Sequence, residues 1–530
     1  MKGSSKIHHK PYIPPICGEF SKKPYISRLA PTSDGFELEC IYMTDTCYTL
    51  CWSERGMDQY SKLDIDSNSV TLTGLECDKE YELYIEDENG LRSKIRLVRT
   101  GIIPEGCTVI NYLHPEDEYY DISGKFMGSP SLVRAKDGSL IAGMDYFKGK
   151  GAQNLVTLFK SRDDGKSWSH LCDLMPFYWG SIFSHNDELY MMGLTTEYGH
   201  LQIIKSVDCG ETWSAPVTLF YGSNMLCRTG GMHRAPMQMV KHNGRLYTTC
   251  EYGSWGRTTH SPAVISIDEN DDLMVPENWS CTGFLPFEGK WAEEAVEKGD
   301  TIEGNVVVAP DGQLYEFLRW KIGEFLKLKI DADDPEKSLE YSSIIKAPVS
   351  NSMFRIIPYK GKYLLFTNRK TETAEKISPD VHSYRNVLSV YISDNLEEFT
   401  LVKDIFNYEN SRAEEIGFQY PVVVPDDDGF IMVVRSAFNG ADTYHNSNYM
   451  LFIKGALCYE CDKDKFHMCE AKKTDVVSSV GAGDSFSASF LSKYLKGYQI
   501  NQCLDFATKI SGYVVSQPGA IPEYTSKDFE

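Results

Sequence analysis

Charged side chains and one tyrosine flank a series of short hydrophobic runs in the middle of this chain, and many of them are arginines. The set comprises Asp145, Glu197, Arg234, Glu251, Glu303, Arg319, Arg355, Arg369, Tyr420 and Arg435. Charged residues beside strands usually form a solvated rim. So many arginines on an acidic chain also fit a second interpretation, because a planar guanidinium fork matches a carboxylate. The pattern therefore favours a site for an anionic ligand.

Three segments between these runs carry further side chains that could act on a ligand. They read GMHRAP, EYGSWGRTTHSP and SAFNGADTYHNSN. His233, His260 and His445 could serve as acids, bases or hydrogen-bond donors. Trp255 could stack on a sugar ring. A lone loop histidine is more often a surface residue, but loops rich in Gly, Ser and Asn also build binding sites.

The hydrophobic runs belong to a hairpin that recurs six times, each copy being a β-rich run, a two-residue turn and a second β-rich run. The turns fall at Asp137-Gly138, Asn186-Asp187, Asn243-Gly244, Asp311-Gly312, Lys360-Gly361 and Asp428-Gly429. Asp-Gly and Asn-Gly pairs tolerate the positive φ of a tight hairpin. The turns recur every 50 to 70 residues or so, about the length of a four-stranded blade with its loops. The sequence therefore predicts a mainly β fold containing a six-bladed β-propeller.

This architecture would bring the charged set together. In each hairpin, the start of the first strand and the end of the second lie at the edge opposite the turn. Residues at these positions in six blades would ring one mouth of the central channel. We therefore expect the arginines and carboxylates of the set to face one another there.

Two turn sequences agree with the repeat. SRDDGKSW at 161–168 and SVDCGETW at 206–213 share the pattern S-x-D-x-G-x-[S/T]-W, and SDNLEEF at 393–399 looks like a decayed copy. In such a turn the Asp oxygen accepts backbone N–H bonds, the Gly takes a conformation that other residues resist, and the Trp packs inward. The motifs resemble the Asp boxes of the sialidase superfamily.

The sialidase resemblance implies specific site residues. In that family a Glu, an Asp-Gly hairpin and an Arg share one blade; the Glu polarises a nucleophilic Tyr and the Arg binds the substrate carboxylate. EGNVVVAPDGQLYEFLR supplies Glu303 and Arg319, and RNVLSVYIS supplies a second carboxylate-binding residue, Arg385. QYPVVVPDDDG places Tyr420 where the family has its nucleophile. A neutral phenol approaches an anionic sugar with less repulsion than a carboxylate does.

The chain also departs from the family pattern. Its first blade has Gly128-Ser129-Pro130 where the family has Arg-Ile-Pro, and the loop YFKGKGAQN lacks the family's acid/base Asp. Asp145 and Glu251 are the remaining candidates for the acid/base. Arg234, His233, Arg435 and Trp255 are the other expected substrate contacts. We therefore expect an exo-acting glycoside hydrolase for another sugar, with a carboxylated one favoured; a non-catalytic carbohydrate-binding propeller is the alternative.

The C-terminal segment KKTDVVSSVGAGDSFSASFLSKYLKGYQINQCLDFATKISGYVVSQPGAIP changes to helical periodicity. It resembles the end of the ribokinase-like (PfkB) sugar kinases, in which Gly-Ala-Gly opens a helix as an anion hole and the next Asp is the base. These roles would fall on Gly481, Ala482, Gly483 and Asp484. The resemblance covers only about 75 residues and omits the sugar-binding part, so we expect a truncated fragment without kinase activity. ATP and magnesium would be cofactors only if a second chain completed it.

Residues 24–101 alternate short β-rich runs with turns. Leu75 lies six residues before Tyr81, and Trp52 falls on an earlier run. This arrangement resembles a fibronectin type III domain, in which the Tyr hydroxyl ties a corner between strands. Such modules are usually spacers or docking surfaces, so no chemistry is expected there.

Composition limits the remaining possibilities. The 530 residues include 54 basic and 75 acidic side chains, a net charge of −21 that disfavours nucleic acid as a partner. No run is long enough to span a membrane, and the first 20 residues lack a secretory signal. The 15 cysteines show no disulfide spacing, which predicts a cytoplasmic protein unless a signal has been removed. Cys458, Cys461, His467 and Cys469 lack a standard zinc spacing, so no metal is expected.

The predicted domains are an N-terminal tail at 1–23, the β-sandwich at 24–101, the propeller at 105–454 and the kinase-like fragment at 455–530. The expected partner is a carbohydrate substrate.

Overall fold

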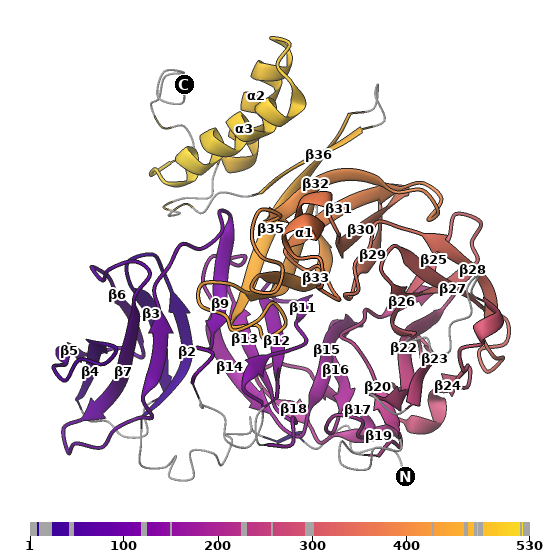
Figure 1. The fold of residues 1–530 in the computed structure, drawn as a ribbon, viewed down its shortest axis with the longest axis horizontal. Coiled ribbons are helices and arrows are strands. Elements are labelled where there is room, and N and C mark those ends of the chain that lie inside the picture. The colour runs from indigo at the N-terminus through magenta and orange to yellow at the C-terminus, as the bar shows by residue number, and fades with distance from the viewer. Residues whose placement is uncertain are drawn as a thin grey trace.

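The computed structural model describes residues 8–9, 24–41, 47–117, 124–148, 151–223, 230–255, 258–291, 301–426, 429–460, 465–470, 474, 477, 481–519 and 522. Sheets arranged in a ring form most of the molecule, with a small sandwich on one side and a pair of helices on another (Figure 1). The predicted mainly β fold is therefore confirmed.

Six antiparallel sheets make up the ring. The first contains β10 (Phe126–Met127), β11 (Ser131–Arg134), β12 (Leu140–Phe147), β13 (Val156–Ser161) and β14 (Ser169–Leu174). The second contains β15 (Tyr178–His185), β16 (Glu188–Leu194), β17 (Leu201–Ser206) and β19 (Val217–Phe220). The third contains β20 (Gly231–His233), β21 (Val240–His242), β22 (Arg245–Ser254), β23 (Thr258–Asp268) and β24 (Ser280–Cys281).

The other three sheets follow in chain order. The fourth contains β25 (Ile302–Val308), β26 (Leu314–Lys321), β27 (Glu324–Ile330) and β28 (Glu340–Lys346). The fifth contains β29 (Arg355–Tyr359), β30 (Lys362–Asn368), β31 (Val387–Ser393) and β32 (Thr400–Asn407). The sixth contains β33 (Gly417–Asp426), β34 (Gly429–Ala437), β35 (Tyr449–Glu460), β36 (Lys465–Glu470) and, from the start of the propeller, β9 (Cys107–Tyr112).

Short elements lie between and beside these sheets: β1 (His8–His9), β18 (Trp213–Ser214), η2 (Pro276–Asn278), η3 (Gly289–Trp291) and α1 (Glu372–Ile377). β1 pairs with β18. Thr371 caps α1, its side chain accepting the backbone N–H of Ala374.

All six predicted hairpins are present, with each pair of strands antiparallel. Gly138, Gly244, Gly312 and Gly361 each have a φ near +80°, which explains why these turns use glycine. Asp428 lies outside the described residues.

The ring closes where β9 pairs with β35, placing Tyr112 opposite Tyr449 and Cys107 opposite Ile453. The remainder of β35 pairs with β36. β35 is therefore one continuous strand across residues 454 and 455, where the sequence analysis placed a domain boundary. Closure by the strand that precedes the first blade removes the exposed edges that an open ring would leave.

The two S-x-D-x-G-x-[S/T]-W turns have the expected geometry. Asp163 accepts the backbone N–H of Ser167 at 2.9 Å, and Asp208 accepts that of Thr212 at the same distance. The following Trp168 is buried. Both glycines have a φ of +88°. In the decayed copy Asn395 replaces the Asp and accepts the N–H of Glu397. The turns anchor the outer parts of the blades and lie away from the central channel.

Residues 24–101 form the expected sandwich. One sheet contains β2 (Tyr25–Pro31), β3 (Phe36–Ile41) and β6 (Ser69–Leu72); the other contains β4 (Tyr48–Glu54), β5 (Ser61–Ile65), β7 (Glu80–Asp87) and β8 (Arg96–Arg99). The Tyr81 hydroxyl accepts the backbone N–H of Glu76 at 3.1 Å, so the predicted corner bond is confirmed. The sandwich docks on the propeller through a buried Arg96–Asp117 pair, with Nε 2.6 Å from Oδ2.

The C-terminal helices α2 (Ala482–Tyr494) and α3 (Ile500–Val515) pack on each other and, through α3, on β36. His467 on β36 hydrogen-bonds Asn501, and Cys469 lies 3.4 Å from the Thr508 hydroxyl. These two members of the Cys/His group therefore contact α3. Cys461 and the side chain of Cys458 lie outside what the structure describes. Within the described part of the chain, no helix has the length and apolar character needed to cross a membrane.

Gly165 provides a test of how tightly these turns pack. A Cβ at Gly165 would lie 2.0 Å from Phe452 Cε1, whereas a Cβ at Gly138 would meet nothing within 4 Å, although both residues have positive φ. Gly138→Ala should cost about 1 kcal/mol from backbone strain alone, and Gly165→Ala about 3 kcal/mol because the clash adds to the strain. Urea denaturation of both variants measures this difference. Equal losses would contradict the packing described here.

Candidate active site

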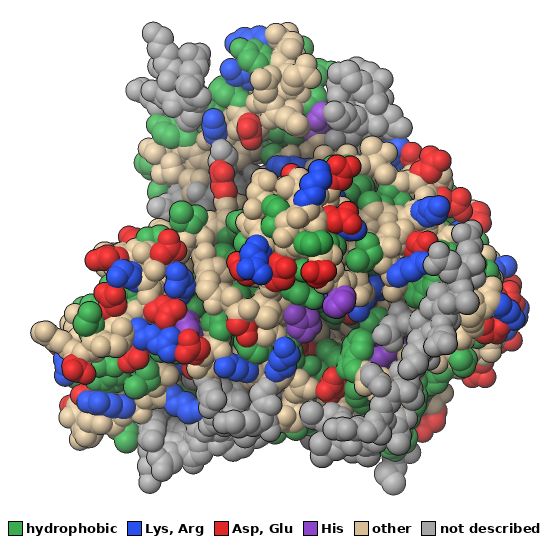
Figure 2. All heavy atoms as spheres, viewed as in Figure 1, with side chains coloured by type: hydrophobic (Ala, Val, Ile, Leu, Met, Phe, Trp, Pro, Cys, Tyr) green, Lys and Arg blue, Asp and Glu red, His purple; other side chains and the backbone are tan. Residues whose placement is uncertain are grey.

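A cavity of about 470 Å³ opens at one mouth of the propeller. Figure 2 shows imidazole side chains near the middle of this face. The predicted residues that line the cavity are Glu197, His233, Arg234, Trp255, Glu303, Arg319, Arg385, Tyr420, Arg435 and His445. Side chains from far apart in the sequence therefore meet at the mouth, as the strand positions in the repeat predicted.

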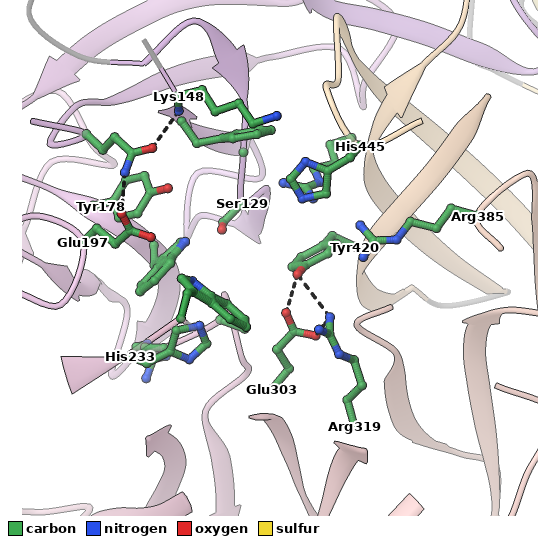
Figure 3. A pocket seen from close by; sticks show the side chains of 18 residues that line it. Ser129, Lys148, Tyr178, Glu197, His233, Glu303, Arg319, Arg385, Tyr420 and His445 are labelled. Atoms are coloured by element: carbon green, nitrogen blue, oxygen red, sulfur yellow. Dashed lines mark hydrogen bonds and ion pairs between the residues drawn. The ribbon is translucent and has the colours of Figure 1, made fainter. Parts of the chain in front are cut away.

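Tyr420 and Glu303 form the central pair of the cavity (Figure 3). The Tyr420 hydroxyl donates a short hydrogen bond to Glu303 Oε1. Arg319 Nη1 lies 2.7 Å from Glu303 Oε2 and 3.5 Å from the Tyr420 hydroxyl. Burial and the neighbouring Glu303 carboxylate raise the pKa of Tyr420, so the phenol is neutral at rest. The carboxylate is positioned to receive the phenolic proton when the oxygen attacks an electrophile.

Both members of the pair lie at strained backbone positions. Glu303 has a φ of +58° and Tyr420 a φ of +59°. Each lies at a β-bulge, where the register shifts between Ile302 and Asn305 and between Gln419 and Val422. Trp179, with a φ of +49°, occupies the corresponding bulge in the second blade. Bulges turn side chains away from the regular alternation, and here they direct these three toward the cavity.

Two further guanidinium groups lie beside Tyr420 without a carboxylate partner among the described residues. Arg435 lies 4.2 Å from the centre of the Tyr420 ring and Arg385 lies 5.7 Å from it. Both donate to the Gln419 side-chain oxygen. Burial lowers the pKa of Arg385 to about 10; the neighbouring Arg435 and Arg319 contribute to this shift and Tyr420 opposes it. This side of the cavity is therefore positively charged, and its guanidinium groups match the geometry of a carboxylate.

Asp145 lies behind the cavity wall and does not line the cavity. Its side chain is buried, and its two oxygens accept the backbone N–H groups of Ser129 and Trp179, each at 2.7 Å. A Cβ at Gly128 would lie 1.9 Å from Asp145 Oδ1. The carboxyl group therefore leaves no room for a Cβ at this position, which explains the glycine there. Burial raises the pKa of Asp145 to about 7.

Glu251 also lies outside the cavity lining, and its carboxyl group connects Glu303 to His233. Its Oε1 accepts the backbone N–H of Glu303 at 2.7 Å, and its Oε2 lies 2.8 Å from His233 Nδ1. Burial raises the pKa of Glu251 to about 7. The carboxyl thus supports the strained Glu303 backbone and orients an imidazole that reaches the cavity.

His233 belongs to an aromatic group on the side of the cavity opposite Arg385 (Figure 3). The centre of its ring lies 4.3 Å from that of Trp179, 4.8 Å from that of His260 and 5.5 Å from that of Trp255. The cavity therefore has a cationic side around Tyr420 and an aromatic side around His233. This division suits a ligand with one anionic group and one apolar sugar face.

Several lining residues were not predicted from the sequence. Lys148, Gln153, Tyr178 and Trp179 also face the cavity. Gln153 donates to Glu197 at 2.7 Å and accepts the backbone N–H of Lys148. Trp179 could have been found from the sequence, because it stands at the same hairpin position as Glu303 and Tyr420. The Lys148 and Gln153 contacts depend on loop conformation and give no repeating signal.

Several of the other predicted residues lie away from the cavity. Arg369 pairs with Asp404, with Nη2 2.7 Å from Oδ2. Arg355 is buried beneath the lining. Gly481 has a φ of +87° and caps α2, whose first turn carries an exposed Asp484. His445 lines the cavity as a neutral imidazole, because burial and nearby cations lower its pKa to about 2. The described residues contain no cluster of three or more side chains suited to a metal ion.

Two family models match this chain, one over the propeller and one over the C-terminal segment. Residues 189–433 match the BNR repeat-like domain, and residues 453–527 match the pfkB family carbohydrate kinases. A nucleoside kinase of Methanocaldococcus jannaschii is 38% identical over 66 residues, which are 12% of this chain and 22% of the kinase. The chain therefore spans about a fifth of that relative's length. The predicted sialidase-like propeller and kinase-like tail are confirmed at this level; the fibronectin type III and Asp-box resemblances stay predictions.

Several solved structures are similar to this chain. An α-L-arabinanase of Penicillium chrysogenum has 14% identity and a TM-score of 0.43, covering 66% of this chain and 97% of its own. A Hadza microbial sialidase has 13% identity and a TM-score of 0.43, covering 84% and 98%. An α-L-arabinofuranosidase of Fusarium graminearum has 12% identity and a TM-score of 0.42, covering 63% and 96%.

The raised pKa of Asp145 gives a testable dependence of stability on pH. With a folded-state pKa of about 7 against 3.8 for the free side chain, the folded state binds the proton more tightly than the unfolded state. The stability from this proton is present at low pH and is lost as pH rises towards 7. From about pH 5 to about pH 7, wild type should therefore lose about 1.4 kcal/mol per pH unit relative to Asp145→Asn.

Urea denaturation of wild type and Asp145→Asn across this range makes the measurement. Asp404→Asn is the matched control, because the Arg369 ion pair helps to lower the pKa of Asp404 below its ordinary value. Its stability difference from wild type should stay constant over the same range. A constant difference for Asp145→Asn as well would show that Asp145 is already ionised at about pH 5.

Proposed function

We propose that this protein is a glycoside hydrolase that acts on a sugar carrying an anionic group. The observation that carries the proposal is the Tyr420–Glu303 pair, with Arg385 and Arg435 beside it and without carboxylate partners of their own. A nucleophile with an adjacent base is the arrangement needed for covalent catalysis at an electrophilic carbon. The guanidinium groups would place the anionic group of the substrate next to that nucleophile.

The proposed first step is attack by the Tyr420 oxygen on the anomeric carbon. Glu303 receives the phenolic proton, a carbon–oxygen bond forms to the tyrosine, and the bond to the leaving oxygen breaks. Arg319 holds Glu303 in place through its Oε2 contact. In the second step water attacks the same carbon, the tyrosine oxygen leaves, and Glu303 returns the proton.

His233 is the proposed general acid for the leaving group and the proposed general base for the attacking water. It lines the cavity on the side facing Tyr420, whereas Asp145 and Glu251, the two candidates from the sequence, lie behind the wall. The protonated imidazole would donate to the leaving oxygen and then take a proton from the attacking water. Glu251 acts through His233, because its Oε2 lies 2.8 Å from Nδ1 and so orients the imidazole. Glu251 is thus a positioning residue.

The second candidate function is carbohydrate binding without turnover. Gly128 in place of the first-blade arginine, and a first-blade loop without a carboxylate, favour it. The aromatic side and the arginines would hold a sugar equally well in that case. Binding measured by calorimetry with no product release would select this function.

The C-terminal helix pair contributes no group to this cavity. Gly483 and Asp484 are exposed at the start of α2. Phosphoryl transfer requires both substrates to be positioned, so a lone anion hole does not support kinase activity. The tail is proposed to be a non-catalytic kinase fragment.

Activity of Tyr420→Phe and Glu303→Gln tests the proposed nucleophilic pair. Substrates are a panel of aryl glycosides, including uronides and sialosides, together with acidic oligosaccharides. Each variant should lower kcat by about 10³-fold or more on any substrate that wild type cleaves, because removing either member abolishes the activated phenol. Tyr221→Phe, an exposed tyrosine outside the cavity, is the control and should keep wild-type activity. Unchanged turnover in Tyr420→Phe would refute the assignment.

The pH profile of Glu251→Gln tests the proposed role of His233. The variant should lower kcat by about 10²-fold and move the alkaline limb of the profile to lower pH, since the protonated imidazole loses its anionic neighbour. His233→Ala should remove that limb. A Glu251→Gln profile with the wild-type shape and only a scaled rate would indicate a purely structural role.

A further inference from the structure

Two arginines lie buried at the centre of the propeller without a carboxylate partner in the described part of the chain. Arg234 follows β20, and Arg355 begins β29. Each is 1% exposed. Arg355 donates one hydrogen bond, from Nη2 to the backbone oxygen of Pro236 at 2.7 Å. The segment that follows β20 and the start of β29 are therefore in direct contact beneath the cavity.

Several donors of these guanidinium groups have no acceptor. Arg355 Nε and Nη1 and Arg234 Nε are fully buried and meet no hydrogen-bond partner in the described structure. The Nη groups of Arg234 are occupied, with Nη2 2.6 Å from Ser181 Oγ and 3.0 Å from the Met237 oxygen. A buried cation with unused donors is costly unless something supplies negative charge or acceptor atoms.

The nearby carboxyls do not supply this charge. Glu251 lies close enough to influence Arg234, but its oxygens are used by His233 and the backbone of Glu303. Glu316 is buried without a partner, and burial followed by the charge of Glu251 raises its pKa well above the ordinary value, which keeps it neutral. For Arg355, burial and then the positive charge of Arg234 lower the pKa to about 9. The region therefore has excess positive charge.

We propose that Arg355 and Arg234 hold a small inorganic anion of the halide class beneath the floor of the cavity. The free donors are all N–H groups, which suit an acceptor-only ligand. Arg234 lines the cavity floor whereas Arg355 does not, so the site lies on the inner side of that floor. The anion would offset one of the two guanidinium charges and fix the segment after β20 against β29. This site does not depend on the proposed hydrolase activity.

Thermal unfolding in different halide concentrations tests the site. The full chain is exchanged into sodium gluconate, and chloride or bromide is titrated in at constant ionic strength. Because a ligand that binds only the folded state raises Tm by mass action, wild type should show a saturable rise of about 3 °C. In Arg355→Met, which keeps much of the side-chain volume, the rise should disappear. Arg369→Met, which removes a guanidinium already paired with Asp404, is the control and should retain it.

Crystals of the wild-type chain grown in bromide provide a second measurement that does not rely on a variant that folds. An anomalous peak within hydrogen-bond distance of Arg355 Nε or Nη1 is the expected result. Water alone at this position, or a Tm that is independent of halide in wild type, would overturn the proposal. A halide response in Arg355→Met equal to that of wild type would overturn it as well.

Discussion

The pairing of β9 with β35 is the interaction on which the site depends. It joins the strand before the first blade to the last blade and so closes the ring. Tyr420 and Glu303 are 117 residues apart in sequence and come from different blades, so their hydrogen bond exists only in the closed arrangement. The same strand connects the propeller to the sandwich, because Ile110 within β9 and Asp117 in the following loop accept hydrogen bonds from Arg28 and Arg96. The closed ring, the cavity and the docking of the sandwich therefore all depend on the pairing of β9 with β35.

Buried carboxyls hold the strained backbone that carries the functional side chains. Asp145 binds the N–H of Trp179, and Glu251 binds that of Glu303. Both bonded residues have positive φ, a conformation that costs about 1 to 3 kcal/mol for a residue other than glycine. The acids that the sequence suggested for catalysis therefore position the residues that reach the cavity.

Positive charge is concentrated at the cavity of this otherwise acidic protein. The chain carries a net charge of −21, yet four arginines without a carboxylate partner among the described residues gather at the cavity. Arg234, Arg385 and Arg435 line it, and Arg355 is buried beneath it. Low dielectric surroundings strengthen the attraction of these groups for an anion. An acidic exterior would slow the approach of an anionic substrate at low salt, so the local cationic surface must provide the binding.

The sequence alone determined the fold class, the six hairpins and the pair Glu303–Arg319, because alternating hydrophobic runs and Asp-Gly turns are local signals. It also placed Tyr420 at the mouth, because repeat position specifies the strand end. It could not show that Asp145 and Glu251 lie behind the wall, that Lys148 and Gln153 face the cavity or that β35 continues past residue 455. Only the tertiary structure decides these points, because bulges reverse which side chains face the channel and the bulges at Trp179 and Glu303 are stabilised by carboxyls distant in sequence.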